Sequence, residues 1–413
     1  MATIRTKEKV LFAIICVVFL FGLWLRYSCA WFAYPLTVNW DEERLLGTVF
    51  NMFERDTFNP SFFNYPSLVI YLNGALFWIL SKVGNFALVD YFVAGRLLTV
   101  AMAGLTIALT ALLAWRIFSP EAAVFSSLFI ATSFMHVRYT AVVRVDPYVA
   151  LWALCAFAAA VAIYRLGPER QYYILGGLFV GLATSSKYTA FLACLPIVVA
   201  HISAYRQGKC ELFNASIFIA GACSLLAFFV TTPYAILDNE RFLAALRFEA
   251  KHYAAGHPGF EAAGATSFAL YGSWLISTGF GFLPCLLAAL GLFYLGKEEP
   301  IMALLLLSFP LALLFFVGQH RVFFPRNIVG LVPFLALLAG FGMAQAYEFA
   351  RSRMDEPFAL VAVSLMALFV VSATTGRSLT FRKECNLPDT RWVAARWVIK
   401  NLPQGCTIGR EQY

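Results

Sequence analysis

Charged residues are scarce in this sequence, because Asp, Glu, Lys and Arg make up 13% of its 413 residues while hydrophobic residues make up 61%. Soluble domains carry about twice that share of charge, so the composition excludes an ordinary soluble protein. Apolar runs of about 17 to 25 residues recur along the chain, which is the length that spans the hydrocarbon core of a bilayer. The composition therefore predicts an all-α polytopic membrane protein.

Paired cysteines and a basic face are also missing. Seven of the nine cysteines lie in or beside apolar segments, without the spacing of a zinc site or a disulfide framework. Only Cys385 and Cys406 could form a disulfide with each other outside the membrane. The net charge is +8, yet Lys and Arg are scattered at the ends of apolar segments with no aromatic interleaving. Nucleic acid is therefore excluded as a partner.

Apolar segments nearly free of charge predict about eleven membrane spans. They cover residues 10–27, 92–117, 121–137, 147–164, 171–186, 188–204, 212–232, 268–295, 301–317, 327–348 and 357–375. Residues 66–80 are apolar as well, but this stretch is short for a span and favours an interfacial or re-entrant helix.

The positions of Lys and Arg orient these spans. Arg5, Lys7 and Lys9 precede the first apolar segment, which predicts a retained first helix with a cytoplasmic amino terminus. If residues 66–80 do not span the membrane, the basic residues at the later helix ends all face the cytoplasm, as the positive-inside rule prefers. These residues are Arg116, Arg165, Arg170, Arg206, Lys209, Lys297, Arg351 and Arg353.

This topology divides the chain into regions. Residues 29–91 form one long external segment, and residues 233–267 form a further external loop. We expect residues 1–375 to be a single transmembrane domain. Residues 376–413 read as the start of an external carboxyl-terminal region, with a short amphipathic helix, that continues beyond this chain.

The segment NWDEERLLGTVFNMFERD, residues 39–56, places three acids side by side directly after the first span. Asn39 is a suitable N-cap with Glu42 three residues later, which predicts a helix start. Its apolar positions share one face, so we expect the helix to lie along the membrane surface; they are Leu45, Leu46, Val49 and Phe53. Acids in a first turn complement the helix dipole, so a structural role and a chemical role are both open here.

Several motifs, taken in order, resemble those of the protein O-mannosyltransferase and aminoarabinose-transferase superfamily. They are Trp-Asp-Glu and Tyr-Pro-Ser-Leu in the first external segment, then RYTAVVRVDPYVAL, GLFVGLATSSKYTAF and PRNIVGLVPFLALLAG. Members of that superfamily are membrane glycosyltransferases of the GT-C fold, which move a sugar from a polyprenyl phosphate carrier to an acceptor on the outer face. The resemblance implies a GT-C transmembrane helical bundle with interfacial helices in the first external loop.

The resemblance implies that Asp41 is the catalytic base, with Glu42 as a neighbour that assists it or binds sugar or metal. Displacing a phosphate-linked sugar with inversion needs a base for the acceptor hydroxyl, whereas phosphate leaves without a second carboxylic acid. A second acidic group near the base is also implied, and Asp146 is the candidate. Asp41 and Asp146 are the expected ligands if a divalent cation binds. Asp146 before Pro147 is equally typical of a helix N-cap.

The departing phosphate calls for positive charge close to the bilayer surface. Four cationic residues are the candidates for binding it: Arg144, Lys187, Arg321 and Arg326. Arg326 also matches the family pattern in its spacing to Pro333. A structural alternative stays open for each, because Lys and Arg at helix ends commonly extend to the lipid headgroups.

The remaining candidate contacts lie in the external loops. Tyr65 stands where many members of the superfamily have Lys or His before the proline. His252 and His257 lie in the loop of residues 233–267, which predicts a second surface helix covering the site. Histidines five residues apart favour interfacial or acceptor contacts over metal ligands, because helical ligands are usually three or four apart.

The sequence therefore predicts an inverting glycosyltransferase in the cell membrane with its active site facing outside. Its donor is a hexose or pentose on a polyprenyl phosphate, and its acceptor is a protein, a lipid or a glycan. The alternative is a polytopic transporter or flippase, which the span count suits equally well; such proteins, however, place ionisable residues at mid-membrane. A structural membrane protein without catalysis is a third class.

Overall fold

The computed structural model describes residues 2–37, 39–255, 266–407 and 409. The elements in these ranges are helical and follow each other along the chain as α1 (Ala2–Tyr27), α2 (Trp40–Glu54), α3 (Leu68–Val83), α4 (Leu88–Ile117), α5 (Pro120–Thr132), α6 (Phe134–Arg138), α7 (Asp146–Leu166), α8 (Arg170–Ser186), η1 (Tyr188–Cys194), α9 (Leu195–Arg206), α10 (Ala215–Thr231), α11 (Tyr234–Leu237), α12 (Asn239–Ala255), α13 (Phe268–Trp274), η2 (Leu275–Gly279), α14 (Phe282–Glu298), α15 (Pro300–Gly318), η3 (Pro325–Leu331), α16 (Val332–Arg351), α17 (Glu356–Cys385) and α18 (Thr390–Asn401). The predicted all-α polytopic class is confirmed.

Seven helices in the described residues are long and apolar enough to cross a membrane, or eight if one bent pair counts as a single span. Three shorter apolar helices, α3, α5 and α10, accompany them. The predicted count of eleven spans is therefore not confirmed. The short helix expected near residues 66–80 is present as α3, and the amphipathic helix expected in the tail is present as α18.

The segment predicted as one span at residues 268–295 is instead broken. Residues Phe268–Gly279 and Phe282–Glu298 form two helical pieces that meet at 110°. Gly281 lies at the corner with φ +99°, a conformation that side chains other than glycine rarely adopt. Hydropathy alone missed this break, because both pieces are equally apolar.

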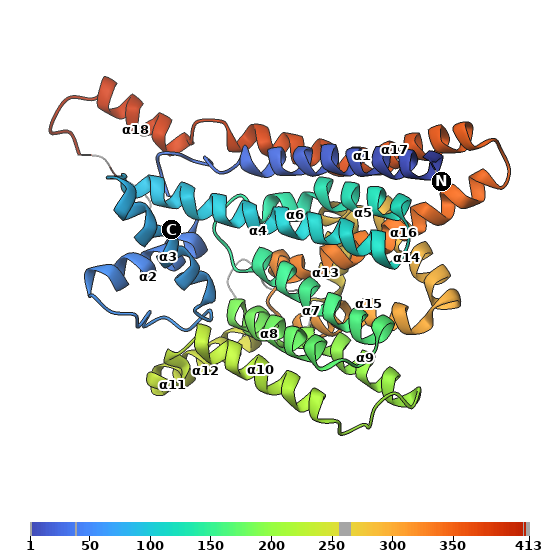
Figure 1. Cartoon of the computed structure of the whole chain (residues 1–413). Coiled ribbons are helices and arrows are strands. Elements are labelled where there is room, and N and C mark those ends of the chain that lie inside the picture. Colours follow the sequence, from blue (N-terminus) through green and yellow to red (C-terminus); the bar gives the residue numbers. More distant parts are fainter. Residues whose placement is uncertain (1, 38, 256–265, 408, 410–413) are drawn as a thin grey trace.

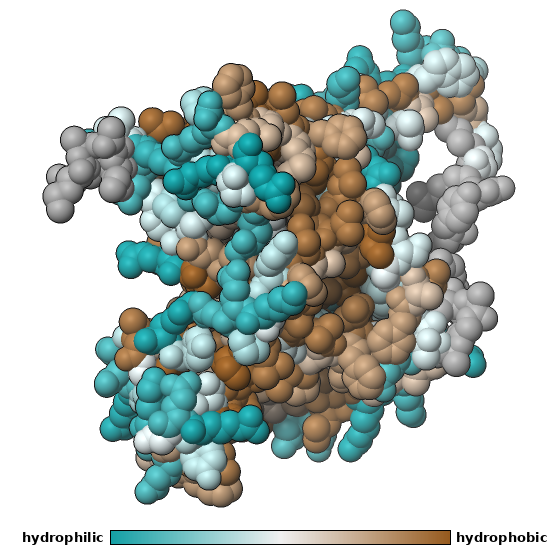
Figure 2. Space-filling model, turned by 90° about the vertical axis from the view of Figure 1, so that its right-hand side faces the viewer, coloured by the Kyte–Doolittle hydropathy of each residue, from teal (hydrophilic) through white to brown (hydrophobic). Residues whose placement is uncertain are grey.

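The outer surface of the bundle is strongly apolar. Figure 2 shows broad hydrophobic areas bordered by hydrophilic side chains. Large apolar side chains stay exposed along α1, α10 and α17, for example Phe12, Leu225 and Phe369. Exposing such side chains to water costs free energy, whereas exposing them to lipid does not. This surface therefore fits a protein embedded in a bilayer.

The interior is built around the helix that η3 and α16 form together, in which 94% of an apolar stretch of 18 residues is buried. Neighbouring helices approach it closely because the contacts are made by small residues. A Cβ atom at Gly291 of α14, for example, would overlap the carbonyl oxygen of Leu338 in α16. Arg326 stands at the start of this buried helix, so its position is set by the packing of the whole bundle.

The two ends of the bundle differ in their polar contacts. At one end, Lys7 of α1 lies 3.1 Å from both Glu121 and Glu356, which fixes the starts of α1, α5 and α17 together. Arg165 and Glu299 form a further pair, between α7 and the α14–α15 loop. We call this the basic end. α1 and α17 run side by side away from it (Figure 1).

The opposite end, which we call the pocket end, carries the first external segment. Leu45, Leu46 and Val49 of α2 pack against Val69 and Ile70 of α3 in one buried cluster. The predicted apolar face of this helix is thus confirmed at those positions. Phe53, expected on the same face, is largely exposed, and Met52 takes the buried position instead.

Candidate active site

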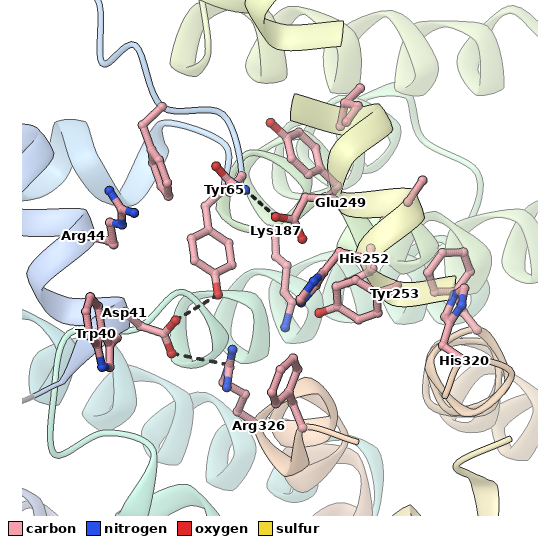
Figure 3. A pocket seen from close by; sticks show the side chains of 18 of the residues that line it. Trp40, Asp41, Arg44, Tyr65, Lys187, Glu249, His252, Tyr253, His320 and Arg326 are labelled. Carbon is pink, nitrogen blue, oxygen red and sulfur yellow. Dashed lines mark hydrogen bonds and ion pairs between the residues drawn. The ribbon is translucent and has the colours of Figure 1, made fainter. Parts of the chain in front are cut away.

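A cavity of about 940 Å³ opens at the pocket end, between α2, the residues before α3, α12 and the start of η3 (Figure 3). Its lining is mixed, with acids, cations, amides and aromatic rings. The lining residues are Asn39, Trp40, Asp41, Arg44, Phe62, Asn64, Tyr65, Lys187, Tyr188, Thr189, Leu246, Glu249, Ala250, His252, Tyr253, Phe316, His320, Phe324 and Arg326. A pocket of this size suits a ligand with several polar groups.

Asp41 is held at the edge of this cavity by the first turn of α2. The side chain of Asn39 accepts a hydrogen bond from the backbone N–H of Glu42 and so caps the helix, as its sequence predicted. The Asp41 side chain is 22% exposed. Its carboxylate therefore points into the cavity while its backbone is fixed.

Three side chains from distant segments converge on the Asp41 carboxylate. Arg144 donates from Nη1 to Oδ2 at 2.7 Å, and Nε of Arg326 lies 3.5 Å from the same oxygen. The hydroxyl of Tyr65 donates to Oδ1 at 3.3 Å. Burial, and after it the charge of Asp41, raise the pKa of Tyr65 well above its usual value, so the phenol stays protonated and keeps donating.

Glu42 points away from the cavity and does not line it. Its two oxygens accept hydrogen bonds from Nε and Nη2 of Arg96 at 2.8 and 2.7 Å, and one of them also accepts from the backbone N–H of Val143 at 2.9 Å. The Glu42 and Arg96 side chains are 0% and 2% exposed. This pair joins α2 to α4 and to the loop before α7.

A second buried network lies behind the cavity wall. Lys187, just after α8, donates from Nζ to Oδ1 of Asp146 at 2.7 Å and to Oδ1 of Asn327 at 2.8 Å. The amide of Asn327 in turn donates to the hydroxyl of Tyr271 at 3.1 Å. Asp146 is the first residue of α7, and the N-cap position falls on Val145. Asp146 does not line the cavity but contacts Lys187, which does.

The far wall of the cavity comes from α12, which confirms the surface helix predicted for residues 233–267. Asn64, in the first external segment, donates to Oε1 of Glu249 at 2.5 Å. Asn59 donates to Asp238 at 2.9 Å close by. α12 has no buried residue, so these polar contacts contribute to holding it over the pocket end.

Two further titratable groups line this wall. Tyr253 belongs to α12, and His320 follows the end of α15. The centroids of their rings lie 5.7 Å apart. Burial raises the pKa of Tyr253 to about 12 and lowers the pKa of His320. Both side chains are therefore neutral near pH 7.

The structure gathers part of the predicted site. Asp41, Tyr65, Lys187, His252 and Arg326 line the cavity, and Arg144 contacts it through Asp41. Arg321 is exposed and does not line the cavity, and His257 lies outside the described residues.

Sequence reasoning missed other lining residues, among them Arg44, Asn64, Glu249, Tyr253 and His320. Helical spacing from His252 to Glu249 and Tyr253 could have indicated the last turns of α12, but Asn64 and His320 carry no local signal.

The expected metal ligands are already engaged. Asp41 faces two guanidinium groups and Asp146 faces an ammonium group, at the distances given above. Within the part of the chain that the structure describes, no group of three or more His, Cys, Asp and Glu side chains is arranged to hold a metal ion. These carboxylates therefore fit cationic side chains better than a divalent ion.

Comparison with solved structures identifies the class of fold. The oligosaccharyltransferase AglB from Archaeoglobus fulgidus, solved with an inhibitory peptide and a dolichol-phosphate, matches 97% of this chain at TM-score 0.63 and 14% identity; the chain spans 59% of that protein's length. ArnT from Cupriavidus metallidurans, solved with undecaprenyl phosphate, matches 91% of this chain at TM-score 0.58 and 17% identity, over 74% of its own length. The chain has the GT-C fold of these membrane proteins.

Part of the sequence is also similar to a known family. Residues 75–236 match the family described as dolichyl-phosphate-mannose-protein mannosyltransferase. No curated protein matches the chain in sequence. The predicted resemblance to the superfamily of protein O-mannosyltransferases within the GT-C fold is thus confirmed. The match begins inside α3 and ends at α11, so it takes in Arg144, Asp146 and Lys187 but neither Asp41 nor Arg326.

Proposed function

We propose that this protein is an inverting glycosyltransferase that moves a sugar from a polyprenyl phosphate to an acceptor hydroxyl. The observation that carries the proposal is the convergence of Asp41, Arg144, Arg326 and Tyr65 on one polar cavity at the end of an apolar bundle. A base and phosphate-binding cations within reach of each other are what this reaction requires.

Arg326 is the group best placed to receive the donor phosphate. Its contact with Asp41 is long, at 3.5 Å, whereas Arg144 holds the same oxygen at 2.7 Å. The phosphodiester of the donor accepts from a guanidinium in a bidentate manner, and its negative charge grows as the sugar leaves. Donor binding therefore draws Arg326 toward the phosphate and frees part of the Asp41 carboxylate, while Arg144 keeps that carboxylate in place.

The chemical step then follows from these positions. The acceptor oxygen attacks the anomeric carbon as the bond from that carbon to the phosphate oxygen breaks, and Asp41 takes the proton of the acceptor hydroxyl. The electron pair of the broken bond goes to the phosphate, where Arg326 and Lys187 stabilise it. Attack opposite to the leaving group inverts the anomeric configuration.

Lys187 is kept ready for this role by its surroundings. Asp146 and Asn327 hold its ammonium group at 2.7 and 2.8 Å, and the residue is only 8% exposed. Such a lysine loses little side-chain freedom when a ligand binds. We assign Asp146 to positioning Lys187 and Glu42 to positioning α2.

The acceptor is expected to approach from the α12 side. Asn64 and Glu249 supply polar groups there, and His252, Tyr253 and His320 add ring surfaces. AglB was solved with an inhibitory peptide and a dolichol-phosphate, and ArnT with undecaprenyl phosphate. These support a lipid-phosphate donor here and leave protein, lipid and glycan acceptors as the classes to test.

The outward orientation of the pocket end is also a proposal. Lys7 and Arg165 belong to the basic end, opposite the pocket end, and the positive-inside rule assigns such a basic end to the cytoplasm. We place the cavity on the outer face of the cell membrane. Residues 1–375 would be the catalytic domain, although α17 continues to Cys385, and residues 376–413 would begin an external region.

The test is sugar transfer by the purified protein in liposomes that contain polyprenyl-phosphate mannose, with a mixture of peptide, lipid and glycan acceptors. Asp41→Asn should insert and fold normally but lower transfer by about 100- to 10,000-fold, the usual contribution of a general base. Glu43→Gln, on the same turn but away from the cavity lining, is the matched control and should keep full activity. Full activity of Asp41→Asn would refute the assignment of the base.

A further inference from the structure

Two cysteines that are far apart in sequence lie together at the pocket end. Cys29 follows the end of α1, and Cys385 is the last residue of α17. Both are buried, at 0% and 2% exposure, and they share a small cluster with Ala141, Phe32 and Phe381. The structure holds both as free thiols enclosed in this cluster.

The backbone around this pair is also held in place. The side-chain amide of Asn386 donates to the carbonyl oxygen of Ser28 at 3.2 Å, so the residues flanking the two cysteines are joined. The N–H of Cys29 donates to the carbonyl oxygen of Arg26 at 3.0 Å. Two buried cysteines in one cluster, with their flanking residues hydrogen-bonded, are held close to each other by the fold, and such proximity is what a disulfide requires.

We infer that Cys29 and Cys385 form a disulfide bond in the mature protein. The inference uses one part of the proposed function, the outward orientation of the pocket end, because disulfides persist in oxidising compartments outside the cytoplasm. Cys406, the partner that sequence alone left open for Cys385, is exposed, whereas Cys385 is enclosed with Cys29.

The oxidation balances with a disulfide-carrying thiol oxidoreductase of the outer compartment as oxidant. One cysteine, as its thiolate, attacks the disulfide of the oxidoreductase and forms a mixed disulfide, and the second then displaces the enzyme thiol. The two cysteines lose two electrons and two protons, and the oxidoreductase leaves as a dithiol. A sulfur–sulfur bond joins α1 to α17.

This bond would stabilise the segments that hold the start of α2 beside the cavity. The carbonyl oxygens of Ala30 and Phe32, directly after Cys29, accept hydrogen bonds from Nη1 of Arg96 at 3.1 and 2.7 Å. Arg96 is the partner of Glu42, which sets the start of α2. The covalent link therefore lies one residue from the contacts that position Asp41.

The test counts protected cysteines in the full chain. Cells are quenched in acid, all free thiols are blocked with N-ethylmaleimide in denaturant, and the protein is then reduced and labelled with a polyethylene-glycol maleimide. Wild type should gain two labels. Cys29→Ala and Cys385→Ala should each gain none, and Cys406→Ala, the matched control, should still gain two. Wild type without any label would overturn the inference.

Thermal unfolding separates a covalent link from simple packing. Each alanine variant should lower the unfolding temperature by a few degrees, and the double variant should lower it no further, because either change alone removes the bond. Additive losses, unaffected by reductant, would mean that the cysteines only pack. Asp41→Asn should keep both labels, so a failed disulfide and a failed assignment of the base give different results.

Discussion

Asp41 and Glu42 are consecutive residues in the first turn of α2, yet they belong to two different regions of the molecule. Glu42 is fully buried and meets Arg96 through two hydrogen bonds, whereas Asp41 is partly exposed in a cavity with its ligands spread over three segments. Neighbouring positions on a helix point about 100° apart. Glu42 can therefore be buried against Arg96 while Asp41 faces the cavity.

The comparison shows how a charged site is built at a membrane surface. A carboxylate that must exchange partners needs water and loose contacts, while one that must stay fixed needs a dry, fully matched partner. The buried contacts of Glu42 with Arg96 keep the start of α2 rigid, whereas the cavity around Asp41 lets its carboxylate exchange hydrogen-bond partners. Variants of the Glu42–Arg96 pair should therefore lose stability, whereas variants of the cavity residues should lose donor binding or turnover.

The largest expected effect is a loss of stability when the buried Glu42–Arg96 pair is broken. Glu42→Gln leaves the buried Arg96 charge without its counter-charge, which costs about 3 to 5 kcal/mol when one partner of a buried pair is removed. Little folded protein should be recovered, as measured by the monodisperse fraction and the thermal unfolding temperature in detergent. If Glu42→Gln kept normal stability but lost sugar transfer, Glu42 would have a catalytic role beside Asp41, which would contradict this prediction.

A smaller effect is expected in the cavity, on donor binding. Arg326→Gln removes a charge-assisted hydrogen bond to phosphate, worth about 1.5 to 3 kcal/mol, so the KM for the lipid-phosphate donor should rise about ten- to hundredfold. The unfolding temperature should change little. Arg321→Gln is the control from the same loop, because Arg321 is exposed away from the cavity; equal effects from both would remove the special role of Arg326.

Tyr65→Phe should have a modest effect confined to turnover. The lost hydrogen bond to Asp41, at 3.3 Å, is worth about 0.5 to 1.5 kcal/mol, or roughly two- to tenfold in kcat. Because the pKa of Tyr65 is raised, the phenol does not ionise near neutral or mildly alkaline pH. The ratio of wild-type to variant rates should thus stay constant across that range, and a ratio that changes with pH would contradict this account.

The smallest effect is expected at the basic end. Arg165 and Glu299 lie 2.7 Å apart, but their side chains are 40% and 34% exposed. An exposed pair contributes less than about 1 kcal/mol. Glu299→Gln should therefore leave both transfer and the unfolding temperature nearly unchanged, and a large loss of transfer would show that the basic end also takes part in function.

Much of this arrangement is visible in the sequence. Hydropathy predicts the helical membrane class, and the N-cap at Asn39 with the apolar positions of α2 predicts where the first acids lie. The family motifs then point to Asp41, Lys187 and Arg326, which the fold does bring to one cavity. Local spacing is sufficient for these features because each depends on a few neighbouring residues.

Other features depend on contacts between distant segments and leave no local signal. Nothing near Glu42 announces that Arg96 will be its partner, so two adjacent acids look alike until the fold separates them. The bend at Gly281 is hidden within a continuous apolar run. Likewise, Asn64 and Glu249 become neighbours only when α12 folds over the first external segment.

The most direct test is a cryo-EM map of the protein with bound undecaprenyl phosphate. The account predicts that the phosphate lies in the cavity within hydrogen-bonding distance of Arg326 and Lys187, with Asp41 still held by Arg144. A phosphate found at the basic end, or against the bundle with lipid between it and Asp41, would contradict it.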